Sequence, residues 1–436
     1  MMIAPFRGIH YNFKKIHDLS RVVVPPYDII SERGRDHFLQ MHPYNFVRVV
    51  KEEKRLEDDE EHNVYTRAAE NFHTWLREEV FLRDVTPCLY YYRQEFTLGD
   101  RKRWQRDGLI ASVKLTEDSI FPHEAIMPDP TEDRFQLLSA CRANLSPIFT
   151  AYPDPTLAVR TLCEKILHRP PFIDVMDNLK VRHLLWRINV EKTIEEVCRY
   201  LKPTPLYIVD GHHRYCAAIK YRDRMRKEKG YRTDAPYESM MMYLCPLEDE
   251  GLKVFPIHRA VYGLEGFNQK SCLKKLSEYF DITATADARK FFEQLEEAKH
   301  GIPIFGCKLF GDINFHIGTL KNLQILEEFC SGHDLCYKRS SVVALHHLVF
   351  ERTLGISEEM ARKEEGVEYV KGLTRDVKMA MLRLSKGDLQ ALFFLPKPEV
   401  SDIVDFARAG ETMPQKSTYF YPKVIGGLVL REHAED

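Results

Sequence analysis

The sequence lacks the features that mark membrane and secreted proteins. No stretch approaches the ~18 uninterrupted apolar residues that a membrane-spanning helix needs. The N-terminus has no cationic segment followed by an apolar run and a small-residue cleavage site, which argues against secretion. Hydrophobic residues make up 44% and charged residues 29% of the chain, an ordinary globular composition. We therefore expect a soluble, cytoplasmic protein.

Cysteine pairs and an excess of one charge are also missing. The ten cysteines are scattered, and the closest two are Cys330 and Cys336, so a zinc knuckle or a disulfide scaffold is not expected. Lysine and arginine number 63 against 65 acidic residues, a formal charge of -2. The chain therefore has no global positive field of the kind that dominates non-specific nucleic-acid binding.

Three common motifs are absent as well: Gly-x-x-x-x-Gly-Lys-[Ser/Thr], Gly-x-Gly-x-x-Gly and His-Glu-x-x-His. The chain is long enough for more than one domain. At roughly 100–200 residues per domain, its 436 residues predict two or three domains. Alternating residues on both sides of Leu98-Gly99-Asp100 predict a hairpin over residues 88–115. The run Phe46 to Val50 predicts a strand, and residues 341–354 predict one helix of a second unit that begins near residue 266.

The segment Asp210-Gly211-His212-His213-Arg214 follows a short apolar strand and begins a helix. We expect Asp210 to cap this helix and Gly211 to let the backbone approach a ligand closely. A helix start carries partial positive charge, and Arg214 adds a planar set of donors, so an anionic phosphate would be held there. The two histidines between them can donate to phosphate or carry a proton. A polar helix start without a ligand is the alternative.

The segment Pro122-His123-Glu124 places a carboxylate beside an imidazole in a loop that prolines stiffen. Glu124 could accept a hydroxyl proton during phosphoryl transfer if it lies within hydrogen-bond reach of the nucleophile. Taken alone, however, this pattern is better explained by an exposed loop carboxylate.

A third segment, Met413 through Lys423, holds two lysines, two hydroxyl side chains and three aromatic residues between prolines. These groups could neutralise phosphates and stack a base, although an edge strand with a turn explains them equally well. Two further clusters could line the same cleft or form ordinary turns: Pro25-Pro26-Tyr27-Asp28, and Asp133-Arg134 with Asn144-Ser146.

These blocks resemble the bacterial and archaeal family catalogued as domain of unknown function 1015, over nearly the whole chain. The blocks that carry the resemblance are Val24-Pro25-Pro26-Tyr27-Asp28, His123-Glu124, Asp133-Arg134, Ala143-Asn144-Leu145-Ser146-Pro147, Asp210 through Tyr215, and Met413 through Lys423. Three blocks are also similar, in the same order, to those of archaeal nucleotide-dependent free-serine kinases, which share a ParB/sulfiredoxin-like fold. These three are Pro122-His123-Glu124, Ile208 through Arg214, and Pro414 through Thr418.

The resemblance implies roles for these residues. The helix start would hold nucleotide phosphate, Glu124 would act as base on a serine hydroxyl, and the late lysine and hydroxyl segment would complete the site. The catalytic candidates are therefore His123, Glu124, Asp210 and His213. The nucleotide-binding candidates are Gly211, His212, Arg214, Lys416, Ser417 and Thr418. The chain departs from the kinases in a long N-terminal extension and in a longer spacing between Glu124 and Asp210, so the acceptor pocket is expected to differ.

Together these inferences predict an α+β fold with a ParB/sulfiredoxin-like mixed α/β core. Residues 1–85 would be an N-terminal extension packed on the core, residues 86–265 the phosphate-binding core, and residues 266–436 a C-terminal α/β domain that completes the active site. The expected activity is phosphoryl transfer between ADP or ATP and the hydroxyl of a small amino acid, first of all L-serine, with Mg²⁺ offsetting charge. The reaction could also run in reverse on phosphoserine. The donor, the direction and a homo-oligomeric state stay open.

Two other classes of function are left open. One is a ParB-like nucleotide-sensing or DNA-associated binding protein without catalysis, against which the neutral overall charge counts. The other is a hydrolytic zinc site built from His123, His212, His213 or His258, which predicts bound zinc in the purified protein.

Overall fold

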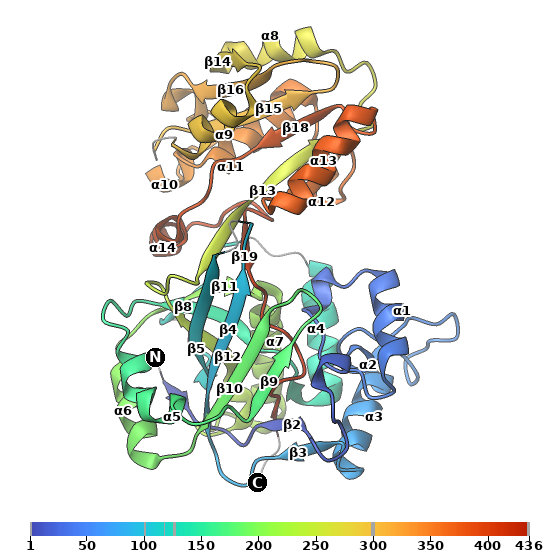
Figure 1. Ribbon diagram of the computed structural model, residues 1–436, viewed down its shortest axis with the longest axis vertical. Helices are drawn as coiled ribbons and strands as arrows, with labels where there is room; N and C mark the ends of the chain where they lie inside the picture. The colour runs from blue at the N-terminus through green and yellow to red at the C-terminus, as the bar shows by residue number, and fades with distance from the viewer. Residues whose placement is uncertain (1, 100–101, 117, 125–127, 298–300, 434–436) are drawn as a thin grey trace. The chain divides into compact units, whose positions relative to one another are not determined.

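The computed structural model describes residues 2–99, 102–116, 118–124, 128–297 and 301–433. The chain divides into two compact units (Figure 1). Unit 1 consists of Met1–Pro122, Ile126–Lys253 and Pro422–Asp436, and unit 2 of His123–Ala125 and Val254–Tyr421. Helices, antiparallel sheet and mixed sheet occur together, which confirms the predicted α+β class. Among the described residues, no helix is long and apolar enough to span a bilayer. The division at residues 85 and 265 stays a prediction.

Unit 1 is built on a nine-stranded mixed sheet in the order β6-β11-β8-β12-β5-β4-β10-β9, with β1 beside β5. Its strands are β1 (Ile3–Ala4), β4 (Leu89–Thr97), β5 (Arg103–Lys114), β6 (Ile120–Phe121), β8 (Ile148–Tyr152), β9 (Ile173–Met176), β10 (Arg182–Ile188), β11 (Leu206–Asp210) and β12 (Ser239–Pro246). Two small sheets pair β2 (Ile9–Tyr11) with β3 (Phe81–Arg83) and β7 (Ala143–Asn144) with β20 (Arg431–Glu432). The antiparallel pair β4 and β5 confirms the predicted hairpin.

The helices of unit 1 pack on one another and on this sheet. They are α1 (Glu32–Met41), α2 (Val47–Val50), α3 (Val64–Arg77), α4 (Pro128–Cys141), α5 (Ala158–Leu167), α6 (Glu191–Leu201) and α7 (His212–Lys229), with 3-10 turns at Leu19–Arg21, Tyr27–Ile29 and Pro236–Glu238. Figure 1 shows α1, α2 and α3 together at one side of unit 1. Helix α3 packs on α4, and α4 packs on α7. The N-terminal residues are therefore connected by packing to the helix that begins at His212.

The strand predicted at Phe46 to Val50 is wrong, because residues 47–50 form the short helix α2. Asn45 Oδ1 accepts a hydrogen bond from the Val47 amide at 3.0 Å, an Asx turn that leads into the helix. Val47, Val49 and Val50 are all buried. Arg48 stands between Val47 and Val49, so the run alternates like a strand, and over so few residues the spacing does not distinguish strand from helix.

Unit 2 holds a seven-stranded sheet in the order β14-β16-β15-β18-β13-β17, with β19 beside β13. The strands are β13 (Lys253–Val261), β14 (Phe280–Thr285), β15 (Ile304–Leu309), β16 (Phe315–Leu320), β17 (Val367–Lys371), β18 (Ala391–Phe394) and β19 (Thr418–Tyr421). The helices are α8 (Gln269–Tyr279), α9 (Ala288–Glu296), a 3-10 turn (Leu323–Leu326), α10 (Leu335–Lys338), α11 (Ser341–Ala344), a π-helix η5 (Leu345–Leu354), α12 (Glu358–Arg362), α13 (Thr374–Lys386) and α14 (Val400–Ala409).

Both faces of this second sheet are covered. On β18, Ala391 and Phe393 belong to one apolar core, and Leu392 and Phe394 belong to another. Successive side chains of a strand point to opposite faces, so a strand buried on both sides reads as a continuous apolar run. The predicted helix at 341–354 is confirmed in extent, but only its first turn is α-helical and the rest is a π-helix.

Candidate functional site

The predicted phosphate-binding segment lies at the carboxyl end of β11, an interior strand between β6 and β8. Gly211 is the N-cap of α7, and its φ of 96° is a left-handed conformation that favours glycine. A Cβ atom at this position would lie 2.7 Å from a terminal nitrogen of Arg214. The guanidinium is therefore folded back over Gly211. The start of a helix carries partial positive charge, which favours an anion at this position.

Asp210 has a different role from the predicted one, because it does not cap α7. Its carboxylate forms ion pairs with Lys423 and with Arg214, the latter at 3.0 Å. Burial alone would raise the pKa of Asp210, but Lys423 and Arg214 hold it below its ordinary value. Asp210 is thus an anion between two cations in the group of residues at the start of the helix. Lys423 belongs to the late segment noted in the sequence, but no local signal assigned it to Asp210.

Arg214 also ties α7 to the segment before β8. Its guanidinium donates to the carbonyl oxygen of Pro147 as well as to Asp210. A small cavity of about 40 Å³ adjoins this arginine, and Arg134, Asn144 and Ser146 are among the residues that line it. One of the two clusters that the sequence left unassigned therefore lies beside the predicted phosphate-binding arginine.

The N-terminal segment contributes residues near the same helix start. Burial raises the pKa of Tyr27 to about 12, and the Arg134 guanidinium carbon lies 3.8 Å from the centre of its ring. The Lys51 ammonium donates to the Tyr27 carbonyl oxygen at 2.9 Å. His213 is half-buried; burial lowers its pKa, and the Asp28 carboxylate acts in the opposite direction. His212, the first residue of α7, is buried. The polar surroundings of the helix start thus include Tyr27 and Asp28.

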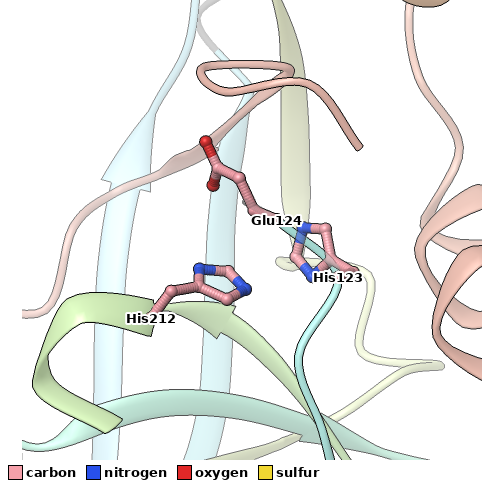
Figure 2. A group of neighbouring side chains, drawn as sticks. All are labelled: His123, Glu124 and His212. Atoms are coloured by element: carbon pink, nitrogen blue, oxygen red, sulfur yellow. The ribbon is translucent and has the colours of Figure 1, made fainter. Parts of the chain in front are cut away.

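The second group of predicted residues lies in unit 2. Glu124 forms an isolated parallel bridge with Met413, and the Met413 amide donates to the His123 carbonyl oxygen at 2.7 Å. The Lys416 amide donates to Glu124 Oε1 at 2.5 Å. Figure 2 shows the side chains of His123 and Glu124, which are adjacent in the sequence and point in different directions. It also shows His212 of α7. The predicted general base and the late lysine segment are therefore in direct contact although 292 positions separate them.

Lys416 is held by its backbone and by its side chain. Its φ is 55°, and its carbonyl oxygen accepts a hydrogen bond from Arg259 at 3.1 Å. Its ammonium group pairs with Glu364 and lies 4.2 Å from the centre of the Tyr369 ring. Burial lowers the pKa of Arg259 to about 10, while Tyr369 and Glu124 act to raise it. Arg259, a buried cation whose charge acts on Glu124, was not predicted from the sequence, and its position inside β13 gave no signal.

Ser417 and Thr418 continue this segment. Ser417 is buried, and its hydroxyl donates to the Pro414 carbonyl oxygen. Both residues line a cavity of about 630 Å³ in unit 2 together with Arg339, Lys397 and Arg408. The predicted site residues thus form two groups: Asp210 through Arg214 with Lys423 in unit 1, and His123 with Glu124 and residues 416–418 in unit 2.

Comparisons with known proteins place this chain in context. A family profile described as protein of unknown function (DUF1015) matches residues 3–314, so the segment around Lys416 and Lys423 lies beyond the matched range. No curated protein matches the sequence.

Several solved structures are similar over most of their length. A mutant free serine kinase in complex with AMP is 14% identical, and the match covers 71% of this chain and 87% of that one with a TM-score of 0.36. A conserved hypothetical protein from Pyrococcus furiosus is 17% identical, with coverages of 72% and 92% and a TM-score of 0.35. SbnI with a C-terminal truncation, from Staphylococcus aureus, is 11% identical, with coverages of 73% and 86% and a TM-score of 0.34.

Proposed function

Because the chain belongs to the family described as protein of unknown function (DUF1015), we propose an activity from its own site residues: nucleotide-dependent phosphoryl transfer to the hydroxyl of a small amino acid, with free L-serine as the first candidate. The observation that carries this proposal is the group at the start of α7. There Gly211 is the N-cap of the helix, and two cations, Lys423 and Arg214, pair with the Asp210 carboxylate. That set of donors suits a nucleotide phosphate. The order of the three motifs shared with free-serine kinases supports the acceptor.

In the proposed reaction, the α7 amides and Arg214 bind the phosphates of ATP or ADP. Glu124 accepts the proton of the serine hydroxyl as the serine oxygen forms a bond to the terminal phosphorus. The bond between that phosphorus and its bridging oxygen breaks, and the nucleotide leaves with one phosphate fewer. The contact of the Lys416 amide with Glu124 Oε1 fixes the orientation of the carboxylate. Run in reverse, the reaction would transfer the phosphoryl group of phosphoserine to a nucleotide.

Mg²⁺ is part of the proposal because the transferred group carries several negative charges. Mg²⁺ binds one or two carboxylates together with substrate phosphates, and Asp210 supplies such a carboxylate at the start of α7. When bound, the ion would offset charge on the phosphoryl oxygens. The ParB/sulfiredoxin-like assignment of the core belongs to the same proposal and rests on the motif resemblance.

The direct test is a screen of L-serine and other hydroxyl amino acids with ATP, ADP and pyrophosphate as donors, followed by phosphorus NMR. We expect a phosphomonoester signal with one amino acid and one donor. Glu124→Gln should lower turnover by about 10²–10⁴ without loss of nucleotide binding. Glu368→Gln is the matched control, because Glu368 is another unit 2 carboxylate, paired with Arg383.

Two outcomes would contradict the proposal. Near-normal turnover of Glu124→Gln would remove Glu124 as the base. Nucleotide binding without any product in the whole screen would favour the nucleotide-sensing or DNA-associated alternative, which a gel-shift assay at low and high salt then tests.

A further inference from the structure

The π-helix η5 (Leu345–Leu354) brings together three side chains outside both groups of site residues. In an α-helix of 3.6 residues per turn, residues i and i+5 point about 140° apart. A π-helix has i→i+5 hydrogen bonds, so residue i+5 lies over residue i while residue i+4 stays close. Glu351 is i+5 from His346 and i+4 from His347. The wider turn therefore lets one carboxylate reach two consecutive imidazoles, and π-helical turns are frequent at functional sites.

The ligand atoms of these three side chains lie close together. Glu351 Oε1 lies 3.4 Å from His346 Nε2, and Glu351 Oε2 lies 2.9 Å from His347 Nδ1. One ligand atom from each residue lies within 4.8 Å of the other two. Ligand atoms at about 2.0–2.1 Å from a tetrahedral zinc ion are about 3.3–3.4 Å apart. Small rotations of the three side chains would therefore bring their ligand atoms to the distances that a zinc ion needs.

The surroundings hold the His347 imidazole in place and leave all three side chains partly exposed. The ring of His347 stacks on Phe329, with centres 5.6 Å apart and planes 16° apart. Arg352 lies over the same phenylalanine ring. The side chains of His346 and His347 are 17% and 18% exposed and that of Glu351 is 32% exposed, so an ion can enter from solvent.

Two further charged groups, Glu358 and Arg259, lie near His346 besides the members of the group itself. A merely structural cluster in which Glu351 accepts from both histidines is the alternative.

We propose that His346, His347 and Glu351 bind one divalent transition-metal ion, with Zn²⁺ as the best fit. Two imidazoles and a carboxylate favour zinc and its neighbours over Mg²⁺, which prefers oxygen ligands. Three protein ligands leave the fourth tetrahedral position for water. The proposal is independent of the proposed phosphotransferase activity, because no residue of this triad belongs to the phosphate or Glu124 groups.

The test uses the full-length protein stripped with EDTA and titrated with Zn²⁺ against a chromophoric chelator. We expect one tight equivalent in the wild type, weakened by about 10- to 100-fold or more in His346→Gln, His347→Gln and Glu351→Gln. His333→Gln is the matched control, since His333 also pairs with a glutamate, Glu411 at 2.8 Å, but without a second imidazole. No tight equivalent in the wild type would overturn the proposal, as would unchanged affinity in all three variants.

A second measurement needs no variant of the triad. Diethyl pyrocarbonate modifies accessible imidazoles, and mass spectrometry of the wild type reports each site. Zn²⁺ should protect His346 and His347 and leave His333 reactive. Equal modification of His346 and His347 with and without Zn²⁺ would overturn the proposal, and so would a zinc equivalent that only His212→Gln removes.

Discussion

Lys423 forms an ion pair with Asp210, 213 positions earlier in the chain. Two side chains of the unit 1 sheet fix the backbone around Lys423. Buried Arg106 donates to the Pro422 carbonyl oxygen at 2.6 Å, and Gln94 donates to the Lys423 carbonyl oxygen at 2.9 Å. The last segment of the chain thus returns to unit 1 and supplies a cation to the start of α7. Lys423 lies outside the range matched by the family profile, so the C-terminal part of the chain contributes a residue to the predicted phosphate-binding group.

Lys423→Ala should therefore affect stability more than an ordinary surface substitution. The Lys423 and Asp210 side chains are 10% and 19% exposed, so the variant would leave a largely buried carboxylate with Arg214 as its remaining cation. We expect a loss of about 1–3 kcal/mol in the free energy of unfolding, measured with chemical denaturant. Lys220→Ala is the control, because the pair of Lys220 with Glu132 is 50% and 47% exposed and should contribute about 0–1 kcal/mol. Equal losses in the two variants would contradict this account.

Gly211→Ala should separate backbone strain from phosphate binding. An added Cβ would meet the Arg214 guanidinium at 2.7 Å, and a φ of 96° costs a non-glycine residue about 1–2 kcal/mol. Gly355→Ala has the same kind of left-handed backbone, with φ 72° and no atom within 4 Å of the new Cβ. Both variants should lose stability, and only Gly211→Ala should lose nucleotide affinity, measured by calorimetric titration. Unchanged affinity in Gly211→Ala would remove the helix start from the nucleotide site.

Local sequence signals were sufficient for much of the fold. The alternation on both sides of the glycine turn predicted β4 and β5, and the strand before Asp210 predicted β11 and the start of α7. Each of these elements depends on residues close together in the sequence, whose spacing reports their period directly. The α2 helix was missed because Arg48 stands between Val47 and Val49, which gives four helical residues the alternation of a strand.

The partners of the candidate residues could not be predicted in the same way. Nothing in the spacing around Asp210 indicates that Lys423, rather than the helix amides, would satisfy its carboxylate. Arg259 reads as one residue of an apolar strand, yet it lies buried beside the backbone of Lys416. Contacts between residues hundreds of positions apart depend on the arrangement of the sheets, which local patterns do not contain. The catalytic and nucleotide-binding roles themselves stay predictions.

Lys416 and Glu364 should have opposite effects on nucleotide affinity. The Lys416 ammonium is paired with Glu364 in the absence of a nucleotide, so a bound phosphate would compete with this carboxylate. Lys416→Met should weaken nucleotide binding by about tenfold, the equivalent of roughly 1.4 kcal/mol. Glu364→Gln should strengthen it by about two- to fivefold, because an exposed ion pair is weak. Lys378→Met, at an exposed position of α13, is the control. The same direction of change in Lys416→Met and Glu364→Gln would exclude this competition.

His258 should make the stability of the protein fall as the solution becomes acidic. Burial lowers its pKa from 6.5 to about 3, with a further lowering from Arg259. Its Nδ1 accepts the Leu395 amide at 3.1 Å, a hydrogen bond that requires this nitrogen to be unprotonated. Since the unfolded chain binds the proton more readily than the folded one, acidification from pH 7 to pH 5 favours unfolding.

The expected contribution of His258 to this change is about 2 kcal/mol, from 1.36 kcal/mol per pKa unit. The comparison is with His258→Asn, whose side-chain oxygen can replace Nδ1 as the acceptor for the Leu395 amide but does not titrate. Wild type and variant should be unfolded in denaturant at pH 7 and pH 5, with exposed His62→Asn as the control. The wild type and His62→Asn should lose about 2 kcal/mol more than His258→Asn on acidification. If all three lose the same amount, His258 titrates alike in the folded and unfolded chains, and its burial does not set the acid sensitivity.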